Sequence, residues 1–282
     1  MLASIRSFFA VTGRLSPALA GRIAAWLFAR PRRHARPERE RALIARGEPV
    51  ALPAGLRATS WGVGPTVLLV HGWEGRGAQL GAFVDPLVAS GHRVIALDGP
   101  AHGDSPGRTT TGVEFAAALA TVRQSVGPLA AIVAHSFGGF SSLLAISRGV
   151  ATDRLAIIAA PSSVPEVLAD FVELIHLPRR ALPHLVRALE ERVHAAMESF
   201  EVASFAHTVK IPVLVAHDTE DKEVSYEHGP RLAEMLGAQL LTTTGLGHRR
   251  ILFAPEVVNT IVEFVDEART ARQNVTSTRE EE

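Results

Sequence analysis

Residues 129–139 have the sequence LAAIVAHSFGG, a short apolar run that ends at Ser136 and is followed by Phe137 and two glycines. The run has the length of a buried strand, and residues 140–147 can continue as a helix. A serine between a strand and a helix, with small residues around it, suits a sharp turn that lifts its hydroxyl off the sheet edge. Good packing alone also favours small residues in such a turn. The chemistry of Ser136 therefore depends on the partners that other loops supply.

The composition is typical of a globular protein with a sizeable core. Of the 282 residues, 47% are hydrophobic and 21% are charged, and the length fits one large α/β domain or two small ones. The formal net charge is zero, so no overall field favours nucleic acid as a partner. The chain has no cysteine, which excludes disulfides, thiolate nucleophiles and cysteine-based zinc sites.

Expected strands and helices alternate along most of the chain. Two short extended pieces within 48–61 are followed by strand-like apolar runs at 66–70, 92–97, 129–134, 155–160, 211–216 and 239–242. Helical spacing of apolar residues is found between and after these runs, at 76–90, 112–125, 140–147, 226–236 and 254–271. The alternation predicts an α/β fold with a mostly parallel, doubly wound sheet. The core of this fold is expected from residues 48–161 and 210–270.

Two segments depart from the alternation. Residues 162–209 contain no convincing strand and are expected to form two or three amphipathic helices, near 165–175 and 181–200. Residues 271–282 are polar and end in a run of charged residues, so we expect them to form a disordered tail.

The first segment, residues 1–47, is strongly basic. Its ten arginines and two glutamates give it a local charge of +8, and we expect it to form a helical extension. Its apolar stretches are interrupted by Arg14 and Arg22 and stay shorter than the ~20 residues of a membrane span. It also lacks the clean apolar centre of a signal peptide. We therefore expect a cytoplasmic protein.

Part of this basic segment has an apolar face. In a helix over residues 16–30, Leu19, Ile23, Trp26 and Leu27 fall on one side. A helix with basic flanks of this kind can lie on an anionic membrane surface, which would give weak peripheral contact through residues 1–35. The alternative is that it packs on the domain or pairs with another subunit.

In open α/β sheets, ligands bind beyond the carboxyl ends of the strands. The residues just after the expected strands include Asp98 with His102, Ser136, Asp218 with Asp221, and His248. A serine hydroxyl needs a base to take its proton and a carboxylate to orient that base. The chain order Ser136, Asp221, His248 is the order expected of one particular fold.

With these loops the chain resembles the α/β-hydrolase family, over about residues 50–268. Residues 134–138 resemble the family's nucleophile elbow, usually Gly-x-Ser-x-Gly, with alanine in the first place. The tripeptide at 71–73, His-Gly-Trp, looks like the oxyanion loop that follows the third strand. Residues 98–105 look like the family's structural Asp-x-x-x-His-Gly-x-Ser loop.

The loops for the acid and the base also resemble those of the family. Residues 217–224 are similar to the acid loop, whose Asp-x-x-Val pattern selects Asp221. For Asp218 the alternative is a role in forming a turn or capping a helix. The Gly247-His248 pair resembles the loop that carries the catalytic histidine.

The resemblance implies a mechanism without a metal or an organic cofactor. Ser136 Oγ would attack a carbonyl carbon while His248 acts as general base. Asp221 would fix the imidazole tautomer, and the backbone N–H groups of Trp73 and Phe137 would form the oxyanion hole. Water would then release the acyl group from Ser136.

Other polar residues near these loops have simpler expected roles. His71 and His102 are expected to fix loops by hydrogen bonds, and His135 to be a pocket wall or packing residue. Arg249 and Arg250 are expected to be solvated, or alternatively to bind an acidic group of the substrate.

The insertion at 162–209 falls where this family often carries a cap over the active site. Its large apolar side chains can line a substrate tunnel or pack the cap onto the core: Phe171, Leu174, Ile175, Leu185, Met197 and Phe200. A cap of this composition favours a substrate with an apolar acyl group.

We therefore expect a serine hydrolase that cleaves a small-molecule carboxylic ester or thioester. The same triad also supports carbon–carbon or amide hydrolysis and acyl transfer. A small-molecule sensor that retains the triad but has little turnover is the alternative from another class. The identity of the substrate and the oligomeric state stay open at this point.

Overall fold

The computed structural model describes residues 2–280, with side chains for residues 2–267. Its centre is an eight-stranded sheet in the order β1-β2-β4-β3-β5-β6-β7-β8. The strands are β1 (Glu48–Ala51), β2 (Arg57–Trp61), β3 (Thr66–Val70), β4 (Arg93–Asp98), β5 (Leu129–His135), β6 (Leu155–Ile158), β7 (Val213–Asp218) and β8 (Gln239–Thr243). The β1–β2 and β2–β4 pairs are antiparallel and the other neighbouring pairs are parallel. This confirms the predicted mostly parallel sheet.

The middle of the sheet is apolar because helices cover both of its faces. Every residue of β3 and of β5 is buried, as expected for parallel strands without a solvent face. The two strands are neighbours in parallel register, with Val70 opposite Ala134. The carboxyl ends of the parallel strands therefore meet at one edge, where the loops with the predicted site residues begin.

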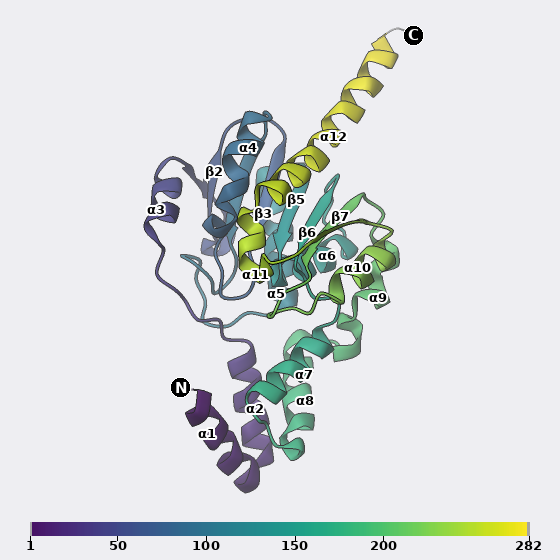
Figure 1. Ribbon diagram of the computed structural model, residues 1–282. Coiled ribbons are helices and arrows are strands. Elements are labelled where there is room, and N and C mark those ends of the chain that lie inside the picture. The colour runs from purple at the N-terminus through teal and green to yellow at the C-terminus, as the bar shows by residue number, and fades with distance from the viewer. Residues whose placement is uncertain (1, 281–282) are drawn as a thin grey trace.

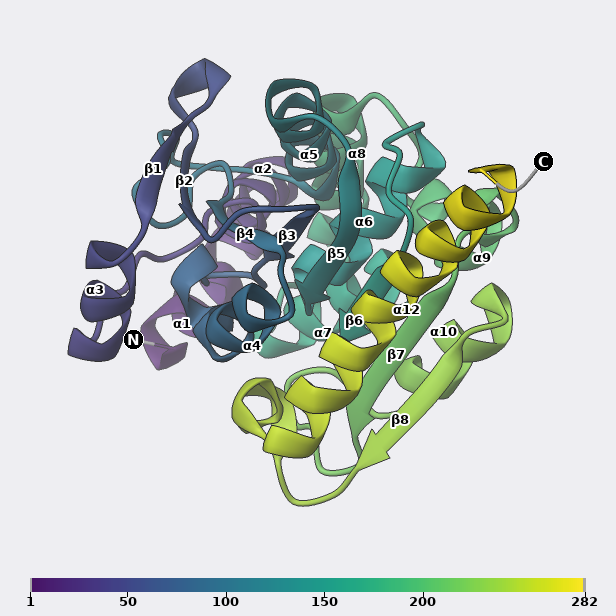
Figure 2. The ribbon, with the colours of Figure 1, turned by 90° about the horizontal axis from the view of Figure 1, so that it is seen from above.

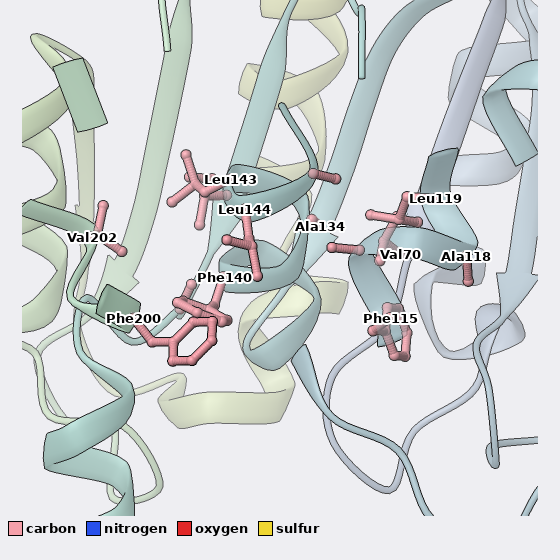
Figure 3. Close-up of a cluster of buried hydrophobic side chains, with 14 of the residues drawn as sticks. Val70, Phe115, Ala118, Leu119, Ala134, Phe140, Leu143, Leu144, Phe200 and Val202 are labelled. Carbon is pink, nitrogen blue, oxygen red and sulfur yellow. The ribbon is translucent and has the colours of Figure 1, made fainter. Parts of the chain in front are cut away.

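The helices form a layer on each side of the sheet. One layer contains α5 (Gly112–Val126), α6 (Phe137–Ser147) and α10 (His228–Leu236), and the other contains α4 (Val84–Ala89) and α12 (Pro255–Glu280). Figure 2 shows α5 and α12 on opposite sides of the sheet. Side chains of α5 and α6 gather around Val70 and Ala134 in the first layer (Figure 3). This arrangement is the doubly wound one that the alternation predicts.

Two helices are shorter than the sequence predicts. The helix expected at 76–90 starts as a 3₁₀ turn, Gly77–Phe83, and only then becomes α4. Pro86 has no N–H to donate to the preceding turn, which weakens a regular helix there. The helix expected at 181–200 ends at Val193, because His194 takes a left-handed conformation with φ of 54° and closes it.

Residues 162–209, called here the cap segment, lie between β6 and β7. They form α7 (Val164–Leu174), α8 (Leu182–Val193) and α9 (Val202–Phe205), with short 3₁₀ turns between them. Ser163 caps α7, since its Oγ accepts a hydrogen bond from the N–H of Glu166 at 3.1 Å. Figure 1 shows α7 and α8 below the sheet, next to the first helices of the chain.

The helices α1 (Leu2–Leu15) and α2 (Pro17–Phe28) form a hairpin, called here the N-terminal hairpin. Its second helix packs along α8 of the cap segment (Figure 1). Gly21 permits this close approach: a Cβ at this position would lie 2.6 Å from Cβ of His184 and 2.7 Å from the carbonyl oxygen of Ala181. The basic extension thus packs on the cap segment, and packing on the domain is one of the three arrangements that the sequence leaves open.

The face of α2 that packs is not the apolar face expected from the sequence. The buried residues of α2 are small: Ala20, Gly21, Ala24 and Ala25. Leu19 and Trp26 are instead about half exposed, at 53% and 48%. The small side chains face α8 because they allow the backbones of α2 and α8 to come close together.

The remaining helices are α3 (Glu38–Ala45), which follows the hairpin, and α11 (Gly247–Arg250), which precedes α12. The tail predicted to be disordered starts at residue 271, whereas α12 continues as far as Glu280. Beyond Pro255 this helix contains neither glycine nor proline that would end it. Residues 281–282 lie outside the described residues. Within residues 2–280, no helix is long and apolar enough to cross a membrane.

Candidate active site

Ser136 lies in a sharp turn between β5 and α6. Its backbone has φ of 53° and ψ of −125°, a strained conformation that costs on the order of 1–3 kcal/mol for a residue with a side chain. Gly138 makes the turn possible, because a Cβ there would lie 2.7 Å from the carbonyl oxygen of Val70. Ala134 stands where the family's elbow usually has glycine. Its methyl group is fully buried and packs in the same hydrophobic cluster as side chains of α5 and α6 (Figure 3). The turn therefore has the conformation expected of a nucleophile elbow.

Asp221 is the carboxylate in contact with His248. Its Oδ2 lies 2.7 Å from His248 Nδ1, and its Oδ1 accepts the N–H groups of Glu223 and Val224 at 2.8 and 2.9 Å. Burial by itself raises the pKa of this carboxyl, but hydrogen bonds from His217, His248 and Val224 together hold its pKa well below the usual range. Asp221 is therefore ionised at neutral pH.

Asp218, the rival acid, is committed to other partners. Its Oδ2 accepts the hydroxyl of Thr243 at 2.7 Å and the N–H of Leu246 at 3.0 Å, and its Oδ1 accepts the N–H of Glu220 at 2.9 Å. These bonds join the loop after β7 to the loop after β8. The structure thus brings Asp221, and not Asp218, to the imidazole of His248.

His248 lies in the short helix α11, and Ser136 lines the same cavity. With Nδ1 donating to the Asp221 carboxylate, the other ring nitrogen, Nε2, is left as the acceptor. A neutral histidine in this tautomer is the form that can take a proton from a serine hydroxyl. Ser136 and His248 therefore line one cavity, and Asp221 contacts the imidazole of His248 without itself lining that cavity.

His135 has a positioning contact that the sequence does not suggest. Its Nε2 donates to the carbonyl oxygen of His248 at 2.9 Å, and the centroids of the two rings are 4.6 Å apart. Burial, reinforced by the nearby His248, lowers the pKa of His135 to about 3. A neutral His135 thus anchors the backbone of the predicted base and also lines the cavity.

The loop after β3 is fixed by two buried histidines. His71 Nδ1 donates to the carbonyl of Gly72 at 2.7 Å, and its Nε2 accepts the N–H of Gly99 at 2.9 Å. His102 Nε2 accepts the N–H of Glu74 at 3.1 Å. Burial lowers the pKa of both rings, in the case of His102 to about 4. Both remain neutral at physiological pH, so they hold the loop by hydrogen bonds and not by charge.

The basic N-terminal segment also holds this loop. Arg32 forms a two-pronged ion pair with Glu74, with Nε to Oε1 at 2.8 Å and Nη2 to Oε2 at 2.9 Å. A second pair, between Glu40 of α3 and Arg76, is almost completely buried, with Nη2 to Oε1 at 2.9 Å. Trp73, whose N–H is a predicted oxyanion donor, thus lies in a loop tied at two points.

Sequence reasoning does not find these ion pairs because their members are far apart in the chain. The available signal is chemical: Glu74 and Arg76 lie within the largely buried loop after β3, and buried charges require partners. The arginine-rich segment that precedes residue 47 is the supply of such partners for Glu74.

The cavity has a volume of about 1020 Å³ and contains Ser136, Trp73, Phe137 and His248 in its wall. Five of the six cap-segment residues predicted for a tunnel line it: Phe171, Leu174, Ile175, Met197 and Phe200. Leu185 does not line the cavity and is fully buried in the packing of the cap segment. Arg249 lines the cavity and pairs with Glu223, whereas Arg250 donates to the carbonyl groups of Gly245 and Leu246.

The N-terminal hairpin also lines this cavity, which the sequence does not predict. Its contribution is apolar and comprises Leu2, Ile5, Leu27 and Phe28. Phe28 of α2 meets Phe171 of α7 edge to face, with ring centroids 5.1 Å apart. The wall of the cavity is thus assembled from the hairpin, the cap segment and the core. Over the residues that the structure describes, no cluster of histidine and carboxylate side chains is arranged to hold a metal ion.

The sequence pattern of the α/β hydrolase family matches residues 67–261. Since this covers more than half of the chain, the protein belongs to the α/β hydrolase family, as the motifs suggest. Membership makes the general class that of a hydrolase. No protein with curated annotation matches the chain.

Solved structures show the same fold at low sequence identity. A suspected lipase from Acinetobacter baumannii AYE has a TM-score of 0.62 and 21% identity, over 82% of this chain and 95% of its own. A bacterial membrane phospholipase A has a TM-score of 0.62 and 19% identity, over 82% and 89%. A meta-cleavage product hydrolase from Pseudomonas fluorescens IP01 has a TM-score of 0.59 and 20% identity, over 79% and 98%.

Proposed function

We propose that this α/β hydrolase is a serine hydrolase that cleaves a carboxylic ester or thioester through an acyl-enzyme on Ser136. The observation that carries the proposal is the 2.7 Å contact between Asp221 and His248 at the cavity that Ser136 lines. The strained turn at Ser136 supports the proposal, because strained backbone conformations of this kind cluster at active sites, where the surrounding structure holds them in place.

In the proposed reaction, Ser136 Oγ forms a bond to the carbonyl carbon while its proton passes to Nε2 of His248. The ionised Asp221 stabilises the resulting imidazolium through Nδ1. As the tetrahedral intermediate collapses, His248 gives the proton to the leaving alcohol or thiol. Water then attacks the acyl group with His248 again as base, and this step restores the Ser136 hydroxyl.

The negative charge on the carbonyl oxygen is assigned to the backbone N–H groups of Trp73 and Phe137. Phe137 is the first residue of α6, and the first N–H groups of a helix have no partner within that helix. Removing one such donor costs about 3–4 kcal/mol of transition-state stabilisation where it has been tested. The ion pairs of Glu74 and Arg76 support the other donor by holding the loop of Trp73.

The walls of the cavity favour an apolar acyl group. Aromatic and aliphatic side chains of α1, α2 and α7 surround much of it, and its volume of about 1020 Å³ is at the upper end of small-molecule sites. We therefore assign the substrate to the esters or thioesters of medium or longer acyl chains.

Labelling with a fluorophosphonate tests the nucleophile. The expected result is that Ser136→Ala abolishes labelling, because the reagent needs a serine oxygen activated by its neighbours. Ser162→Ala is the matched control, since Ser162 Oγ also lies against a histidine, 2.8 Å from His228 Nδ1, but is buried outside the cavity lining. Labelling that persists in Ser136→Ala and disappears in Ser162→Ala would overturn the assignment.

A further inference from the structure

The N-terminal hairpin exposes an unusual number of large apolar side chains. Its packed side covers the cap segment, while these residues stay at the surface: Leu2, Phe8, Val11, Leu15, Leu19 and Trp26. Leu15 is 82% exposed and Val11 58%. In α1, Phe8, Val11 and Leu15 recur at helical spacing, so the exposed side chains form one stripe of the helix. Exposed apolar groups gathered in this way mark an interaction surface.

The charge of the hairpin identifies the kind of partner. Residues 1–37 contain no aspartate or glutamate, and the hairpin carries Arg6, Arg14 and Arg22. Arg14 and Arg22 are exposed and have no carboxylate partner among residues 2–267. Arg30, just after α2, lies over the ring of Trp26 at 4.4 Å. Apolar and aromatic side chains among unpaired arginines are complementary to an anionic lipid surface.

The same hairpin reaches the proposed active site from its other side. Ile5, Leu27 and Phe28 line the cavity that contains Ser136. Leu2 and Leu174 belong both to the cavity wall and to the exposed surface, at 39% and 49% exposure. Arg6 Nε donates to the carbonyl of Leu174 at 2.9 Å and ties α1 to this rim. The apolar wall of the cavity thus continues to the exposed face of the hairpin.

We propose that the N-terminal hairpin docks on an anionic lipid bilayer and that the acyl chain of the substrate passes from the bilayer into the cavity along Leu2 and Leu174. This inference rests on the proposed hydrolase function and deepens it, because it makes the substrate an amphiphilic ester that resides in a membrane. The side chains of Leu15, Leu19 and Trp26 enter the interface, and Arg14 and Arg22 face the lipid phosphates.

Binding to lipid vesicles tests the docking surface. Full-length protein is mixed with vesicles of phosphatidylglycerol and phosphatidylcholine, or of phosphatidylcholine alone, at low ionic strength. The expected result is binding to the anionic vesicles only, and its loss at high salt. The double variant Leu15→Glu, Leu19→Glu is expected to bind at least about tenfold more weakly. Val63→Glu is the matched control, since Val63 is 84% exposed in the turn before β3.

Fluorescence locates the contact and separates it from catalysis. Brominated lipid is expected to quench the tryptophan fluorescence of the wild type, and this quenching is expected to be lost in Trp26→Phe. Ser136→Ala is expected to bind vesicles as well as the wild type, and the double variant to cleave a dissolved short-chain ester normally. Equal binding to both vesicle types, equal loss with Val63→Glu, or a dimer that hides Trp26 would overturn the docking proposal. Vesicle binding without any esterase activity would overturn the proposed function and leave docking intact.

Discussion

Asp218 and Asp221 show how neighbouring residues of one type acquire different tasks. Both carboxylates are buried and both have a lowered pKa, but their hydrogen-bond partners differ. Asp218 accepts from backbone N–H groups and Thr243, and so holds two loops together. Asp221 is turned to His248. The Asp-x-x-Val spacing is sufficient to select Asp221 because Val224 N–H bonds back to its carboxylate and closes the turn.

Replacement of each aspartate by asparagine is expected to separate the two tasks. Asp221→Asn should lower kcat/KM by roughly 10⁴, since the amide favours the wrong tautomer of the imidazole. Asp218→Asn should instead lower the free energy of unfolding by about 1–3 kcal/mol, because a buried acceptor is disrupted. Ester kinetics and urea unfolding of both variants provide the measurement. A larger kinetic loss in Asp218→Asn would exchange the two assignments.

His135 marks the limit of sequence reasoning at this scale. Its position beside Ser136 correctly indicates a pocket wall. Its bond to the carbonyl of His248 depends on how a loop from the other end of the chain folds over it. No local pattern contains that information.

Secondary structure elements follow local pattern closely where packing agrees with it. The parallel strands and most of the helices between them lie within a few residues of their expected positions, because apolar runs bounded by turns leave little choice. The exceptions have local as well as tertiary causes. α8 ends at the left-handed His194, and α2 packs through alanine and glycine because α8 approaches so closely.

The cavity wall formed by α2 and α7 is expected to set the preference for acyl length. Medium-chain esters should have a higher kcat/KM than acetyl esters, since a longer chain buries more apolar surface against Phe28 and Phe171. Phe171→Ala should reduce that ratio by about tenfold and leave acetyl ester turnover unchanged. Leu182→Ala, at an exposed position of α8 outside the cavity wall, is the control. An unaltered ratio in Phe171→Ala would contradict the proposed path of the acyl chain.

In the whole molecule, the basic extension contacts the cap segment, the cavity and the core, although its composition suggests a separate segment. The basic extension packs on the cap segment, lines the cavity and pairs with Glu74 and Arg76 of the core. Composition alone reveals the excess of arginine in this extension. The carboxylate partners of Arg32, Arg36 and Arg46 lie tens of residues away, and only the folded chain brings them together.

The buried neutral histidines make the stability of the whole fold depend on pH. Burial lowers the pKa of His102 from 6.5 to about 4, so the unfolded chain binds more protons between these values. The contribution of the neutral His102 to the free energy of unfolding is therefore fully present above about pH 6.5 and is lost as the pH falls toward 4. His71 and His135 act in the same direction, because burial lowers their pKa as well.

Urea unfolding at a series of pH values measures this effect. In His102→Gln the free energy of unfolding should fall less steeply with decreasing pH than in the wild type. The two slopes should differ by about 1.4 kcal/mol per pH unit, because one proton fewer is taken up on unfolding. His207→Gln, at an exposed position, is the matched control. A slope for His102→Gln that equals the wild-type slope would show that His102 is not neutral in the folded protein.

The close fit of Gly21 against His184 also has a consequence for synthesis on the ribosome. The hairpin emerges before α8, which follows about 160 residues later, and at about 5–20 residues per second this is a delay of roughly ten to thirty seconds. During that interval the alanine face of α2 is exposed on the nascent chain together with Leu19 and Trp26. A chaperone or a bilayer that binds the nascent hairpin therefore does so before the cap segment, on which the hairpin will pack, has been synthesised.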